Sequence, residues 1–400
     1  SRGLGDVYKR QTYAPIWDPE KPNQYNKNFY GVNIMNPMEN LARQKNNKNK
    51  ENRLIASGAA TISFLPNLKL KSSVALDRRN GVSTTFLDPI STTDGRNSFG
   101  TASDNRNMNT VLVFDNILTY NTNIKKHGID VMAGSSYTKS DYTNSWINGS
   151  HFRDDKIQTL NAANKISWDG TGTGASQWAI SSYFARVSYN YDSKYMLTMN
   201  MRADGSSKLH PDHRWGIFPS FSAAWRISSE KFMKDITWID DLKLRGGWGQ
   251  TGNQSGIGDY SYLQRYNINR IPWFEEGNDH AVPGISQANL RTSDLKWETT
   301  SQTNIGLDLT VLNNRLTFSM DYYYKKTTDM LMNVSLPAGA AATTSITRNE
   351  GEMTNKGFEF AINSHNLTGE FSWDTDFNIS FNKNKLTKLC LLYTSPSPRD

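Results

Sequence analysis

Residues 315–325, RLTFSMDYYYK, alternate between apolar and polar side chains along their whole length. The apolar side chains fall on every second position: Leu316, Phe318, Met320, Tyr322 and Tyr324. Because successive side chains of an extended chain point to opposite sides, this alternation predicts a β-strand with one apolar and one polar face.

The residues before this stretch predict its partner strand. Positions 304–311 alternate in the same way, and Asn313 and Asn314 lie between the two runs. Asparagine tolerates the positive φ of a tight turn, so the segment is predicted to be one antiparallel hairpin.

The same pattern recurs along the chain and predicts about twelve strands in total. The further runs lie near 53–64, 68–77, 111–121, 128–138, 183–191, 195–204, 220–227, 242–249, 357–363 and 371–382. We predict no helix in the body of the chain apart from a short helical turn within 228–240. The fold class expected is therefore all-β.

Charged side chains fall on only one face of the clearly alternating strands. Leu197 and Leu244 belong to apolar faces that carry no charge, whereas Lys243 and Arg245 belong to the opposite faces. A lipid-facing Arg or Lys costs roughly 2–4 kcal/mol at the middle of a bilayer, while a water-filled lumen accepts charge. The pattern favours a transmembrane β-barrel over a soluble sheet.

Aromatic side chains gather near predicted strand ends on the apolar faces: Tyr189, Tyr191, Tyr195, Tyr322, Tyr324, Phe371 and Trp373. Such rings prefer the headgroup level of a membrane, which predicts interfacial girdles. Aromatics also cap the strands of soluble sheets, and that alternative remains open at this point.

The predicted connections alternate in length, with 228–240 as an exception. Short turns are expected near 65–67, 192–194, 313–314 and 364–369, and long polar loops near 78–110, 139–182, 205–217, 250–298 and 327–354. Outer-membrane barrels have short turns on the periplasmic side and long loops outside the cell.

The ends and the composition restrict the remaining classes. No apolar run approaches the roughly 20 residues of a transmembrane helix. Segments 1–11 and 389–400 resemble adapter-derived translations, so the native barrel segment is expected to be 12–388, without the single cysteine, Cys390. The net charge of +7 is spread along the chain and forms no clustered patch for nucleic acid.

Five stretches occur in an order that resembles the SusC/RagA family of TonB-linked outer-membrane receptors. They are RADGSSKLHPDHRWGIFPSFSAAWR at 202–226, EKFM at 230–233, LKLRGGWGQTGNQ at 242–254, LKWETTSQTNIGLD at 295–308 and EGEMTNKGFEF at 350–360. NPMEN at 36–40 resembles a family loop. The matching stretches span about 180–385, and the region before them is less diagnostic.

The resemblance implies a barrel of roughly 22 strands in the bacterial outer membrane. It also implies a plug domain, a TonB-contacting segment and a SusD-like lipoprotein lid, with import of an oligosaccharide, peptide or other large nutrient. We expect a partial barrel that lacks the plug and does not transport by itself. An oligosaccharide is the expected cargo; a peptide or siderophore importer, and a secreted soluble β-protein that binds or cleaves polysaccharide, are the alternatives.

Candidate site residues fall into two groups. Arg202, Asp204 and Arg226 of the resembling segment are expected to face the lumen and to pair with one another or with the plug. Ligand contacts are expected from loop aromatics that can stack on sugar rings: Trp146, Tyr260, Tyr262, Trp273 and Phe274. Histidine and carboxylate spacings indicate no catalytic residues, metal site or cofactor, so the chain is not expected to be an enzyme.

Overall fold

The computed structural model describes residues 15–26, 36–90, 92–167, 170–274, 281–336 and 345–389. Within these ranges one antiparallel sheet dominates, and it follows the chain as a meander in the order β1-β2-β3-β4-β6-β7-β8-β9-β12-β13-β16-β17. The twelve strands of this path confirm the all-β prediction and its approximate strand number. No helix among the described residues is long and apolar enough to span a membrane.

The strands of the main path have the following bounds: β1 Lys48–Leu65, β2 Leu68–Leu87, β3 Thr101–Ile124, β4 His127–Ser150, β6 Gly172–Tyr191, β7 Tyr195–Ser206, β8 Trp215–Arg226, β9 Ile239–Asn253, β12 Glu298–Val311, β13 Leu316–Thr328, β16 Glu352–Thr368 and β17 Ser372–Lys388. The short strand β5, Lys165–Ile166, pairs with β4.

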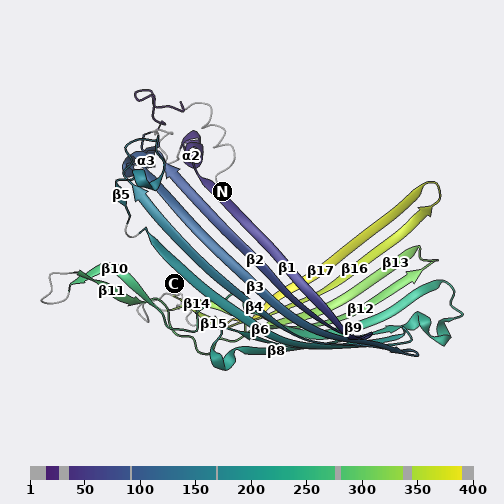
Figure 1. Ribbon diagram of the computed structural model, residues 1–400. Coiled ribbons are helices and arrows are strands. Elements are labelled where there is room, and N and C mark those ends of the chain that lie inside the picture. Colours follow the sequence, from purple (N-terminus) through teal and green to yellow (C-terminus); the bar gives the residue numbers. More distant parts are fainter. Residues whose placement is uncertain are drawn as a thin grey trace, which may run out of the picture. The chain divides into compact units, whose positions relative to one another are not determined.

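The register of β12 and β13 confirms the predicted hairpin. Leu307 pairs with Met320 and Asp308 pairs with Ser319, so apolar residues lie opposite apolar ones and polar residues opposite polar ones. Asn313 and Asn314 have φ values of 58° and 60°, and Leu312 shares this left-handed conformation with 62°. Figure 1 shows β9, β12, β13, β16 and β17 side by side in chain order.

Several predicted connections are wrong in length, because strands continue beyond the clear alternation. β2, β3, β4 and β6 extend far into 78–110 and 139–182, where both sides of the strands are polar and the pattern fades. The loops 250–298 and 327–354 contain hairpins of their own: β10 Tyr266–Phe274 with β11 Ala281–Gln287, and β14 Leu331–Ser335 with β15 Ser345–Asn349. The turn expected at 364–369 lies instead between the end of β16 and Ser372.

The prediction that the body holds no helix is also wrong. Helix α2, Pro37–Gln44, begins after Asn36, whose side chain accepts a hydrogen bond from the Met38 N–H. Helix α3, Thr93–Ser98, begins after Thr92, which caps Gly95 in the same way. Both helices start with an N-cap residue, and α2 also has a proline in its first turn. A search for strand alternation overlooks these helix-start signals. The helical turn expected in 228–240 is present as two 3₁₀ segments, η3 Ile227–Ser229 and η4 Lys231–Met233. Two further 3₁₀ turns are η1 Leu160–Ala162 and η2 Pro211–His213.

The chain forms two compact units. Unit 1 comprises Ser1–Ala56, Leu76–Leu112 and Ser140–Gln177, and unit 2 comprises Ser57–Ala75, Val113–Lys139 and Trp178–Asp400. In unit 1, Phe86, Ala102 and Phe152 form a small buried cluster. In unit 2 the main buried cluster consists of Leu209, Phe218, Ile257, Leu295 and Trp297. Many other apolar side chains of the described strands are exposed, which is unlike the core of a soluble protein.

Candidate functional site

A network of ion pairs crosses the polar face of β9, β12 and β13. Arg245 donates to Asp308 at 3.1 Å and to Asp321 at 2.6 Å. Asp308 also accepts a hydrogen bond from Ser319 at 2.9 Å and pairs with Lys243 at 3.4 Å. The network therefore ties three strands together on the face that the sequence marks as polar.

Gly306 makes this network possible. It lies between Arg245 and Asp321 in the strand register. A Cβ atom at this position would lie 2.6 Å from Arg245 Cζ and 2.6 Å from Asp321 Oδ1, closer than nonbonded atoms approach. The glycine leaves a gap through which the guanidinium passes over β12.

The arginines of the 202–226 segment have partners within the chain. Arg202 pairs with Asp204 at 2.8 Å, donates to Ser182 at 3.0 Å and lies 5.5 Å from the centroid of the Phe184 ring. Arg226 pairs with Asp241 at 3.4 Å rather than with Asp204. Arg202 and Asp204 are thus brought together, while Arg226 belongs to a separate contact at the other end of β8.

The connections at one end of the unit 2 strands pack on one another. Leu209 and Leu295 are fully buried, and the Trp297 indole N–H donates to the Arg214 carbonyl at 2.9 Å. Lys208 pairs with Asp259 at 3.0 Å and lies 5.4 Å from the Trp178 ring centroid. Alternation does not reveal this cluster, although the apolar residues within LKWE, at 295–298, hint at burial.

The structure separates the aromatic residues proposed as ligand contacts. Tyr260 and Tyr262 are half-buried in the connection after β9, and the Tyr262 ring lies 6.1 Å from that of His210 in an edge-on arrangement. Trp146 was predicted to lie in a loop, and this prediction is wrong. It lies on β4 in unit 1, because that strand extends to Ser150. The side chains of Trp273 and Phe274 lie outside the described residues.

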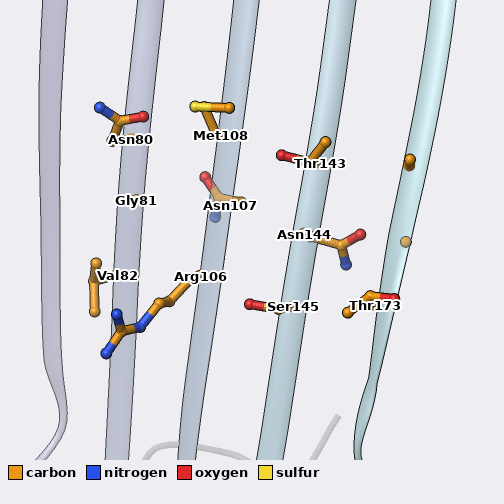
Figure 2. A pocket seen from close by; sticks show the side chains of 12 residues that line it. Asn80, Gly81, Val82, Arg106, Asn107, Met108, Thr143, Asn144, Ser145 and Thr173 are labelled. Atoms are coloured by element: carbon orange, nitrogen blue, oxygen red, sulfur yellow. The ribbon is translucent and has the colours of Figure 1, made fainter.

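A cavity of about 640 Å³ lies across β2, β3, β4 and β6 in unit 1. Figure 2 shows its lining, which is dominated by neutral amides, hydroxyls and glycines. The lining residues are Asn80, Gly81, Val82, Arg106, Asn107, Met108, Thr143, Asn144, Ser145, Thr173, Gly174 and Ala175. Its one charged residue, Arg106, pairs with Asp104 at 2.9 Å, so the polar groups that line the cavity are mainly uncharged.

Glycines let the amides of this cavity lie flat against the neighbouring strands. A Cβ at Gly81 would meet Asn107 Oδ1 at 2.7 Å, and one at Gly174 would collide with Asn144 Oδ1. The Trp146 ring covers Gly172 in the same manner, because a Cβ there would lie 2.8 Å from the ring. Asn144 and Trp146 are two residues apart on one strand and therefore share a face.

No group of three or more His, Cys, Asp or Glu side chains that could hold a metal ion occurs in the described part of the chain. His210 and Asp212 form a local contact of 3.3 Å, and the His210 and His213 ring centroids are 6.5 Å apart.

Residues 2–396 match the family model described as TonB dependent receptor-like, beta-barrel. TonB-dependent receptor P39 of Formosa agariphila is 33% identical over 96% of this chain and 36% of its own length. TonB-dependent receptor SusC of Bacteroides thetaiotaomicron is 31% identical over 96% of this chain and 40% of its own length.

Among solved structures, the RagAB peptide transporter superposes with a TM-score of 0.80 at 25% identity. The match covers 94% of this chain and 41% of the transporter chain. The chain thus spans well under half the length of the proteins it resembles.

Proposed function

Because the chain belongs to the TonB-dependent receptor-like β-barrel family, we propose that it is the substrate-handling part of an outer-membrane importer for a neutral oligosaccharide. The family places the chain in the outer membrane and removes the soluble β-protein alternative. The proposed role is transport rather than catalysis, in a protein longer than the chain described.

The proposal of an oligosaccharide as the substrate rests on the side chains that line the cavity of unit 1. The side-chain amides of Asn107 and Asn144 offer donors and acceptors without net charge, which suits the hydroxyl groups of sugars. Trp146 adds an aromatic ring beside the amides, and such a ring can stack on the apolar face of a pyranose. Together they make a sugar-sized set of contacts on rigid strands.

The partners follow from the family resemblance. A SusD-like lipoprotein would cover the outer end of the barrel, and TonB would supply energy from the inner membrane. Tyr260 and Tyr262, in a connection packed by buried Leu209 and Leu295, are proposed as outer contacts for substrate or lid. Trp273 and Phe274 remain predicted contacts of the same kind.

A peptide is the second candidate cargo. The likeness to the RagAB peptide transporter favours it, and the backbone amides of a peptide would also suit a cavity lined by asparagine. A peptide of mixed charge would need charged partners, and the only charged lining residue already has one in Asp104.

Calorimetric titration of the full-length receptor with neutral oligosaccharides and with peptides of matched size tests the proposal. Trp146→Ala should weaken oligosaccharide binding by up to about tenfold, since one aromatic contact contributes roughly 0.5–1.5 kcal/mol. Trp373→Ala, which removes an exposed ring from the apolar face of β17, is the control and should leave binding unchanged. Binding of peptides alone, or equal binding by both variants, would refute the oligosaccharide assignment.

A further inference from the structure

A groove of about 530 Å³ lies on the apolar face of unit 2. Its lining includes Tyr189, Tyr195, Leu197, Ala223, Trp225 and Gly246. The strand register explains its shape: Leu197, Ala223, Gly246 and Ile305 form one row across β7, β8, β9 and β12. The two middle positions of that row are small, and the neighbouring row holds Tyr195, Trp225 and Leu244.

The packing of the protein does not account for Gly246. A Cβ at Gly249 would lie 2.7 Å from Ser220 Cβ, and one at Gly252 would collide with Phe218, so these glycines of β9 make room for other side chains. A Cβ at Gly246 would meet only the Asn304 carbonyl oxygen, at 3.7 Å. Glycine weakens a strand. Gly246 therefore lowers the stability of β9, and no other described part of the protein uses the space that it leaves.

The walls of the groove are fixed by polar contacts at one end. Glu230 accepts hydrogen bonds from the Tyr195 hydroxyl at 2.6 Å and the Trp225 indole N–H at 3.2 Å. The Tyr189 hydroxyl contacts His127 Nδ1 at 2.8 Å. Three rings therefore present their polar atoms at one end of the groove and their apolar surfaces along it, as rings at a membrane interface do.

We propose that this groove binds one acyl chain of a membrane phospholipid as a specific site. The groove continues the surface that an outer-membrane barrel presents to hydrocarbon, so lipid is the material against which it lies. The adjoining turn at 192–194 is short, which assigns this end to the periplasmic side, where the leaflet consists of phospholipid.

Selectivity over other lipid positions comes from shape. Hydrocarbon gains no hydrophobic free energy by moving from one apolar surface to another. A concave, prearranged surface instead offers a chain more dispersion contacts than the convex barrel wall around it. Ala223 and Gly246 provide the depth, and the anchored rings of Tyr195 and Trp225 provide the wall.

The test measures phospholipid retained by the full-length receptor after extensive washing in mild detergent, by mass spectrometry of the purified protein. Gly246→Leu and Ala223→Leu, which fill the groove, should lose the retained phospholipid. Ala185→Leu, on the same face of β6 but outside the groove, is the matched control and should keep it. Heat-dependent migration on a gel verifies that each variant is a folded barrel.

If the leucine variants do not fold, Gly246→Ala replaces them in the test. This variant should fold, because a Cβ at position 246 has room. It should retain less phospholipid than the native protein. A photoreactive phenylalanine analogue at position 223 in intact cells should give an adduct with the mass of a phospholipid. Equal retention in groove and control variants, or an adduct with lipopolysaccharide or protein, would overturn the proposal.

Discussion

Neighbouring residues of strands β7, β8, β9 and β12 point to opposite faces of the sheet, and the two faces are stabilised in different ways. One row of the polar face contains Thr198, Ser222, Gly247 and Asn304, and the adjacent row of the apolar face contains Leu197, Ala223, Gly246 and Ile305. The polar face is joined by hydrogen bonds and ion pairs between strands. The apolar face leaves its large side chains exposed, so the environment outside the protein must complete it.

The glycines show the same difference on a smaller scale. Gly306 on the polar face is required because Arg245 and Asp321 occupy the space above it. Gly246 on the apolar face has open space above it. On one face a missing side chain serves another part of the protein, and on the other it leaves room for lipid.

The largest expected effect comes from placing a charge on each face in turn. Leu197→Arg puts a guanidinium on the lipid-facing side, where the cost reaches roughly 2–4 kcal/mol at the bilayer midplane and is smaller toward the interface, so the full-length protein should assemble less well. Thr198→Arg places the same group in the lumen and should assemble more readily. The fraction of heat-modifiable barrel in outer-membrane preparations measures both, and equal losses would contradict the assigned faces.

A smaller effect is expected from closing the gap over β12. Gly306→Ala should destabilise the barrel by about 1–3 kcal/mol, because its Cβ displaces the Arg245 guanidinium from Asp321. Gly58→Ala, where a Cβ meets nothing within 4 Å, is the control and should be neutral or slightly stabilising. Urea unfolding in lipid vesicles provides the comparison, and equal stability of the two variants would remove the role given to Gly306.

The smallest expected effect depends on pH and concerns the end of the groove. Hydrogen bonds from Tyr195 and Trp225, with Lys194 nearby, hold the pKa of Glu230 below its usual value. This contact therefore stabilises the fold fully above the usual glutamate pKa of about 4.3 and is lost as pH falls through the lowered value.

Glu230→Gln should accordingly be less stable than the native protein at neutral pH, and the difference should shrink as the solution is acidified below about pH 4. Thermal unfolding followed by tryptophan fluorescence at several pH values measures it. A difference that stayed constant with pH would show that the charge of Glu230 is not what holds the two rings.

The strands and their faces could be predicted because alternation is a local property. The hairpin 304–325 follows from two apolar runs and a pair of asparagines, and its register places each side as expected. The far halves of β3 and β4 could not be predicted, because residues such as 101–110 are polar on both sides and only pairing with neighbouring strands makes them extended.

The sites were harder to predict than the fold. The sequence shows that Arg245, Asp308 and Asp321 belong to polar faces of their strands. Their contact could not be predicted, because Arg245 is 63 residues from Asp308 and 76 residues from Asp321, and only the strand register brings them together. Trp146 was identified as a candidate contact, although its strand position and the neighbouring Asn144 required the structure. Arg202, Asp204 and Arg226 were expected to pair with one another or with the plug, and the segment after β8 brings Arg226 to Asp241.

A nitroxide scan along β6 measures which face of the strand meets lipid and which meets water. Spin labels placed one at a time at positions 182–189 of the full-length protein in lipid vesicles report contact with oxygen, which concentrates in hydrocarbon, and with a water-soluble nickel complex. We expect high oxygen contact at the positions of Tyr183, Ala185, Val187 and Tyr189, and low contact at Ser182, Phe184, Arg186 and Ser188. Oxygen contact without this two-residue period, or nickel contact that is highest at positions 183, 185, 187 and 189, would contradict it.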